Sequence, residues 1–192
     1  MKFIQIFLII ATVTLCSCSK HGNGDTLRLN QQVYEFVFNE VMNDATKKIL
    51  IEKHYNNKYL SDKSVNELVN GYKELHSFPP ILLKEIIEYS SQGEEIDWKP
   101  ILVNATFIDK QHDYKSDEKD RYVFWKSFKD KHPQIGGYYS ISKVAVDTRS
   151  LEAVVLFSYS CAVLCGAHGS LLFLKKEGAQ WKIVSGIRLW VS

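Results

Sequence analysis

The sequence predicts an α+β domain with helices first and an antiparallel β-meander last. Up to Gly93, most apolar residues recur at the spacing of a buried helix face. After Gly137, they fall in short β-branched and aromatic runs separated by turn residues. Helices and strands that are segregated along a chain are typical of the α+β class. The 192-residue chain is long enough for one compact domain, which we expect over residues 28–192.

In the first half of the domain, residue patterns predict three helices and one strand. Asn30 can cap the first helix, and Pro80 suits the first turn of the third. The strand is expected where β-branched and aromatic residues cluster between the first two helices. The expected ranges are 30–43 for the first helix, 48–55 for the strand, 61–75 for the second helix and 80–93 for the third.

The second half is predicted to hold one helix and five strands. Apolar and polar residues alternate over most of 98–110, as in a strand. A helix is expected to open in the charged stretch 115–120 and to run through Phe128, before Pro133 closes it. Short turns between most of the last four strands predict antiparallel pairing. Those strands are expected over 138–146, 151–160, 170–176 and 181–191.

The N-terminal segment resembles the signal peptide of a bacterial lipoprotein. Lys2 supplies a positive charge, the apolar run 3–13 follows, and small Ser17 precedes Cys18. The run is too short to span a hydrocarbon core of roughly 30 Å. Cys16 fits the lipidation site less well, because bulky Leu15 precedes it. The resemblance implies that residues 1–17 are removed and that Cys18 is acylated, with palmitate as a typical chain.

Residues 18–27 are expected to form a lipidated, flexible tether, because the segment is polar and contains glycine. Within it, Asp25-Thr26-Leu27 resembles the O-glycosylation acceptor of Bacteroidetes, which makes Thr26 a candidate for glycosylation. The anchor would hold the protein in a Gram-negative cell envelope, at the outer membrane in preference to the inner, on either its periplasmic or its surface face. The chain has 24 Lys and Arg against 22 Asp and Glu, a balance that gives no sign of nucleic-acid binding.

The segment SYSCAVLCGAHGS, residues 158–170, holds the two cysteines of the folded domain, Cys161 and Cys165. An even pair in an exported protein favours a disulfide, which a curled five-residue segment allows. The alternatives are a copper(I) or zinc site with His168 as third ligand, a catalytic redox pair, and two free thiols. The surrounding glycines indicate a turn instead of the helix that metal and redox motifs use. We therefore expect a disulfide and no bound metal or cofactor.

The remaining ionisable residues match no catalytic motif. Four histidines are scattered, without the i, i+4 spacing of helical metal ligands. The acidic groups at 94–97 and 117–120 are typical of a solvated loop and of a helix N-terminus. The sequence therefore leaves any catalytic residue unknown. The four histidines are His54, His76, His112 and His132.

Aromatic residues cluster in the predicted helix before Pro133 and in the last strands. We interpret most of them as the core between that helix and the sheet. Those left over could line a ligand pocket. The residues are Tyr122, Phe124, Trp125, Phe128, Tyr138, Tyr139, Trp181 and Trp190.

Residues 125–192 resemble a recurrent group of uncharacterised Bacteroidetes lipoproteins. The resemblance is carried by the motif C-x-x-L-C-G at 161–166, the strand sequence at 141–144 and the hairpin at 178–181. The hairpin has one residue more than the Gly-x-Trp of that group, which a three-residue turn accommodates. The group has no assigned activity, so the resemblance implies no catalytic residue. A Gly-Trp hairpin after helices is also similar to NTF2-like or cystatin-like folds, a likeness of fold alone.

These features together predict an envelope protein that binds a partner protein or a small ligand. An inhibitor or immunity-type role is one form of this hypothesis. The membrane is expected to be reached through the lipid anchor, and no nucleic acid is expected as a partner. The alternatives are an enzyme of unrecognised class, and a redox or metal-handling protein that uses Cys161 and Cys165.

Overall fold

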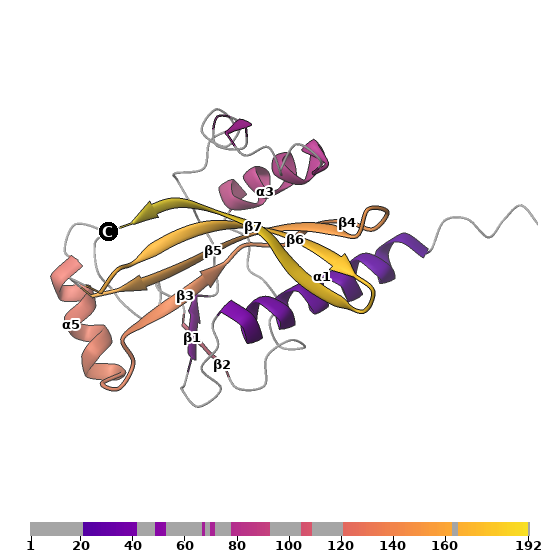
Figure 1. Ribbon diagram of the computed structural model, residues 1–192. Helices are drawn as coiled ribbons and strands as arrows, with labels where there is room; N and C mark the ends of the chain where they lie inside the picture. The colour runs from indigo at the N-terminus through magenta and orange to yellow at the C-terminus, as the bar shows by residue number, and fades with distance from the viewer. Residues whose placement is uncertain are drawn as a thin grey trace, which may run out of the picture.

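The structure is a computed structural model, and it describes residues 21–41, 49–52, 67, 70–71, 78–92, 105–108, 121–162 and 165–191. The predicted α+β class is confirmed, with a helix first and the long strands last (Figure 1). In chain order the elements are α1 (His21–Val41), β1 (Ile49–Glu52), α3 (Pro80–Gln92), β2 (Ala105–Ile108), α5 (Arg121–Lys131), β3 (Gly137–Ile141), β4 (Ala145–Asp147), β5 (Glu152–Cys161), β6 (His168–Glu177) and β7 (Gln180–Val191).

The strands form one sheet in the order β2-β1-β3-β5-β6-β7, and β4 pairs with β5 beside this path. The predicted meander is confirmed for β5, β6 and β7, which are antiparallel neighbours. β3 is also antiparallel to β5, but β1 runs parallel to both β2 and β3, which the sequence did not indicate. Parallel neighbours need a long crossover, and residues 53–104 between β1 and β2 provide one.

The strand predicted over 138–146 is wrong as a single strand, because it is divided into β3 and β4 at Ser142. The Ser142 backbone N–H still donates to the Leu156 carbonyl at 2.9 Å. The Leu156 N–H, however, donates to the Ser142 hydroxyl at 2.9 Å, so the side chain takes the place of a backbone acceptor. The Ser142 carbonyl instead accepts a 3.1 Å hydrogen bond from the Tyr34 hydroxyl of α1. The break therefore attaches a helix to the sheet.

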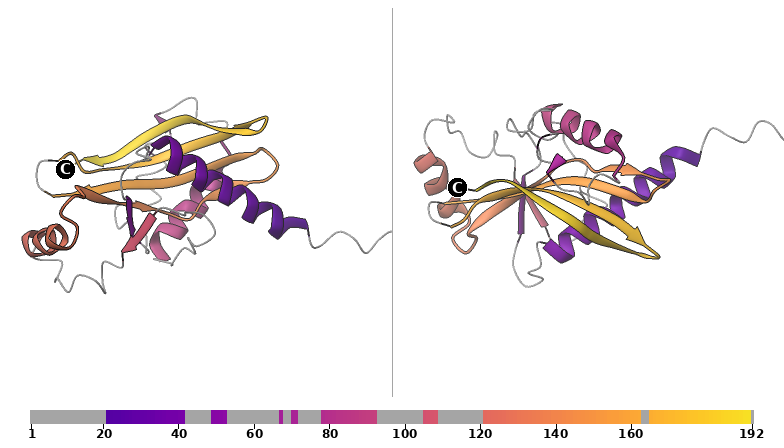
Figure 2. Two further views of the ribbon diagram at one scale, coloured as in Figure 1. Left: turned by 90° about the horizontal axis from the view of Figure 1, so that it is seen from below. Right: turned by 45° about the horizontal axis from the view of Figure 1, so that its top comes forward.

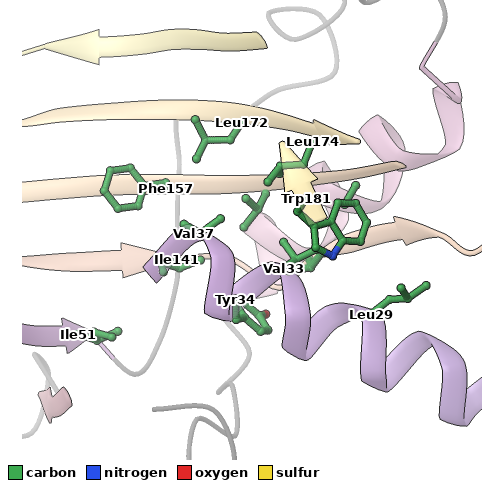
Figure 3. Packing of buried hydrophobic residues seen from close by; sticks show 13 residues of the cluster. Leu29, Val33, Tyr34, Val37, Ile51, Ile141, Phe157, Leu172, Leu174 and Trp181 are labelled. Carbon is green, nitrogen blue, oxygen red and sulfur yellow. The ribbon is translucent and has the colours of Figure 1, made fainter. Parts of the chain in front are cut away.

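α1 covers one face of the sheet and α3 covers the other (Figures 1 and 2). β5 supplies both cores, because successive side chains of a strand point to opposite faces. Val155 and Phe157 pack in the cluster that includes α1, whereas Val154 and Leu156 pack in the cluster that includes α3. Figure 3 shows the α1 cluster, whose labelled residues are Leu29, Val33, Tyr34, Val37, Ile51, Ile141, Phe157, Leu172, Leu174 and Trp181.

α5 lies at the end of the molecule where β3 begins (Figure 1). Its Phe124 and Phe128 are buried against Tyr138 of β3 and Ile108 of β2. The Phe124 and Tyr138 rings meet edge to face with centroids 6.1 Å apart. The expected aromatic core between this helix and the sheet is therefore present. Residues 115–120, where the helix was expected to open, lie outside the described part of the chain.

α1 begins at His21 instead of at Asn30, so residues 21–27 of the expected tether are helical. The glycines in this segment disfavour a helix. Leu29 and Val33 are nevertheless buried against the sheet and hold the next turns in place. Each residue added to an existing helix gains one hydrogen bond, which favours extension towards the N-terminus. The expected second helix lies outside the described residues, apart from Glu67, Asn70 and Gly71.

Candidate functional site

The cysteine segment lies where β5 ends and the chain turns towards β6. The structure pairs Cys161 with Cys165 in a disulfide, with Cα atoms 6.1 Å apart. Cys161 is buried, whereas Cys165 and the following Gly166 are exposed. Gly166 has a φ of 75°, a left-handed conformation that glycine adopts at little cost. The disulfide therefore joins the end of β5 to the residue directly before this left-handed glycine.

His168, the proposed third metal ligand, instead packs among aromatic rings. Its ring centroid lies 6.3 Å from that of Tyr159 and 6.2 Å from that of Phe157. Its Nδ1 atom lies 3.2 Å from the Gly166 carbonyl oxygen, within hydrogen-bonding distance. Within the described ranges, no three His, Cys, Asp or Glu side chains come together in a way that could hold a metal ion.

The rings near the disulfide form a row across neighbouring strands. Tyr139 of β3 lies beside Tyr159 of β5, with centroids 4.9 Å apart, and Tyr159 lies beside His168 of β6. Gly137 faces Cys161 in the register, and a Cβ at this glycine would clash with the Tyr159 ring and the Ser160 carbonyl. These contacts are those of a closely packed sheet surface.

Other residues singled out from the sequence are dispersed. His132 is half-buried and lies against Phe128, with ring centroids 5.2 Å apart. Thr26 lies on α1 and not on an extended tether. The residues outside the described ranges are Cys18, His54, His76, His112 and the acidic groups at 94–97 and 117–120.

A groove of about 440 Å³ lies between α1 and the hairpin that joins β6 to β7. This volume falls within the range of roughly 300–1,000 Å³ that is usual for small-molecule sites. We call it the α1–hairpin groove. Its lining residues are Gln32, Glu35, Phe36, Asn39, Glu40, Ala179, Gln180 and Trp181.

Amide and carboxylate side chains dominate the α1–hairpin groove, and none of the described residues that line it is basic. Glu35 and Glu40 are both exposed to solvent. The Gln31 side-chain amide donates to Glu35 Oε1 at 3.2 Å, and Lys176 Nζ donates to Gln32 Oε1 at 2.7 Å. The Gln32 bond links α1 to β6 beside the groove.

Trp181 lines the groove from the sheet side. Its side chain is only 4% exposed and belongs to the core under α1. Figure 3 shows the indole lying beside Val33 and Leu29 of α1. Within the described part of the chain, the buried Nε1–H has no hydrogen-bond partner. A buried donor without a partner costs about 1–3 kcal/mol, so its presence here requires an explanation.

Sequence reasoning did not find this groove. Its α1 residues form the polar stripe of an amphipathic helix, which has the same pattern as an ordinary solvated face. Its other wall is a hairpin more than a hundred positions later. The one signal that could have indicated it is Trp181, an amphipathic ring directly after a polar turn.

Comparison with protein-family models, with curated proteins and with solved structures finds no match to the chain. Within the described residues, none of the helices has the length and apolar character needed to cross a membrane.

Proposed function

We propose that the protein is a lipid-anchored envelope protein whose domain binds a partner protein or a small ligand in the α1–hairpin groove. The observation that carries this proposal is the groove itself, which is lined mainly by polar side chains, together with half-buried Phe36 and buried Trp181. Sites that bind ligands commonly combine apolar rings with a few polar groups that fix orientation.

The anchor part of the proposal rests on the sequence. Lys2, the apolar run 3–13 and Cys18 have the order found in lipoprotein signals. Several acyl chains on Cys18, each contributing about 0.8 kcal/mol per buried CH₂, would hold the protein on a membrane without help from its surface. The domain is then free to use its surface for binding.

The solvent exposure of the two groove carboxylates favours binding over catalysis. Glu35 and Glu40 are exposed, so neither has the water-poor surroundings that usually adapt a carboxyl group for acid–base chemistry. A carboxylate that remains solvated is better suited to accepting hydrogen bonds from a ligand.

Site-specific photo-crosslinking in cells tests the proposal. A photoreactive amino acid is placed at Glu35 or Asn39, both exposed in the groove, and at Lys126 or Gln134 as controls on other parts of the surface. We expect covalent adducts from the groove positions and not from the controls. The adducts should disappear when Ala179→Trp fills the groove. Adducts from the control positions alone, or groove adducts that survive Ala179→Trp, would disprove binding in the groove.

An inhibitor or immunity-type role is the sharper form of the proposal. It predicts that cells survive a toxin or hydrolase encoded beside the gene only when the anchored protein is present. The groove-filled Ala179→Trp variant should then fail to protect. Equal survival with and without the protein would reject this role and leave binding to be tested by the crosslinks.

A further inference from the structure

We propose that the α1–hairpin groove binds a neutral saccharide. This inference rests on the proposed binding function and adds the chemical class of the ligand. It is drawn from three properties of the groove: the kind of polar groups in its lining, the absence of basic side chains from the described part of that lining, and the two aromatic residues.

The polar lining matches the hydroxyl groups of a sugar. Glu35 and Glu40 offer only acceptors when ionised, whereas Asn39, Gln32 and Gln180 offer both donors and acceptors. A sugar hydroxyl donates one hydrogen bond and accepts others, so neighbouring hydroxyls can pair with both kinds of side chain. Planar amides and carboxylates can also contact two adjacent hydroxyls at once.

The charge of the lining argues against an anionic ligand. Among the described residues, two carboxylates and no Lys, Arg or His side chain line the groove. The nearby Lys176 ammonium donates to Gln32 Oε1 at 2.7 Å. A phosphate, sulfate or acidic sugar would meet repulsion from the two glutamates, and the nearby Lys176 ammonium is already engaged with Gln32.

The aromatic residues argue for a sugar in preference to a basic side chain. Phe36 is half-buried, so part of its ring is open to the groove and can contact the apolar C–H face of a pyranose. The Trp181 Nε1–H has no partner in the described part of the chain and would need an acceptor. A guanidinium or ammonium group has none, whereas every sugar oxygen is one. Trp181 is 4% exposed and its Nε1 atom is buried, so a sugar would reach this N–H only if the side chains around it move.

Isothermal titration of the full-length protein in detergent tests the inference. The probes are maltotriose, cellotriose, chitotriose and mannotriose, with an arginine-containing peptide and inorganic phosphate as comparison ligands. We expect at least one trisaccharide to bind, and the peptide and phosphate not to bind. Glu35→Gln and Asn39→Ala should each weaken that binding by roughly tenfold, because each removes one or more hydrogen bonds.

Two matched variants serve as controls. Asp130→Asn makes the same kind of change as Glu35→Gln at an exposed position on α5, and Gln134→Ala removes an exposed amide in the turn that follows. Both should bind the trisaccharide as the unaltered protein does. Failure of all four sugars, binding that ignores the groove variants, or binding of the peptide alone would overturn the saccharide inference. Groove crosslinks that are lost in Ala179→Trp would still support binding in that case, so the two failures are distinguishable.

Discussion

Ser142→Ala should destabilise the protein, because one hydroxyl takes the place of a backbone acceptor at the break between β3 and β4. The hydroxyl accepts from the Leu156 N–H at 2.9 Å and donates to the Lys143 carbonyl at 2.7 Å. Ser142 is 1% exposed and Leu156 is fully buried, so water cannot easily replace the lost acceptor. Lys143 is only half-buried, and its carbonyl is more easily rehydrated.

The magnitude follows from the cost of an unsatisfied donor. Leaving the Leu156 N–H without a partner costs about 1–3 kcal/mol, so we expect a loss of about 2 kcal/mol in the free energy of unfolding. A domain of this size loses roughly 2–4 °C of melting temperature for each kcal/mol. The expected fall is therefore roughly 4–8 °C.

Urea denaturation and thermal melting, both followed by circular dichroism, measure the effect. The urea midpoint should fall while the slope of the transition stays constant, because the folded state loses a contact without changing its exposed surface much. Ser158→Ala is the matched control. Ser158 is also buried in β5, but it lies in regular pairing with Ser140 and Gly169, where no hydroxyl has to replace a backbone acceptor, so we expect a change below about 0.5 kcal/mol. Equal stabilities for the two variants would refute the assigned role of the Ser142 hydroxyl.

Three further predictions concern the same sheet. Burial raises the pKa of Tyr34 well above the value of about 10 of a solvated tyrosine, so Tyr34 contributes stability that is complete below pH 10 and is lost as the pH rises beyond it. Tyr34→Phe should therefore lower the free energy of unfolding by about 1–2 kcal/mol at pH 7, measured by urea denaturation, and should make the protein less sensitive to alkali. An unchanged alkaline unfolding transition would contradict this. Gly137→Ala should lower the melting temperature strongly, because the new Cβ would clash with the Ser160 carbonyl and the Tyr159 ring. Gly24→Ala, at an exposed position on α1, is the control and should be neutral or slightly stabilising. An unchanged melting temperature for Gly137→Ala would show that β3 can move away from β5. Replacing Cys161 and Cys165 together by Ala should lower the free energy of unfolding by roughly 2 kcal/mol, because the loop that the disulfide closes is short. The groove crosslinks should remain. If the crosslinks were lost while the protein stayed folded, the redox or metal alternative would be favoured.

Elements with a strong local pattern could be predicted from the sequence. α3 begins at Pro80 as expected, because proline fixes a helical φ and its missing N–H is not needed in the first turn. β5, β6 and β7 were found because β-branched and aromatic runs alternate with short turns such as the one at Gly178, where φ is 62°. In these segments local preference and burial indicate the same structure.

Features that depend on distant contacts could not be predicted in the same way. The break at Ser142 requires Leu156 and Tyr34, which lie in two other elements. The early start of α1 at His21 overrides the preference of its glycines and depends on the burial of Leu29. The groove also depends on a distant contact, because the polar stripe of α1 forms a groove only where the β6–β7 hairpin lies beside it. Sequence patterns indicate which residues are buried, but not which polar faces meet.

The corrected start of α1 changes what the proposed lipid anchor would do. A flexible tether would let the groove move freely over the membrane, but α1 is helical from His21, three positions after Cys18. At 1.5 Å per residue, Phe36 lies about 22 Å along the helix from His21. Three extended residues span at most about 11 Å, so the groove could lie no more than roughly 33 Å from an acylated Cys18, whatever path residues 18–20 take. A ligand for this groove would therefore have to come close to the bilayer, which favours saccharide chains of the cell envelope over free sugars in the medium.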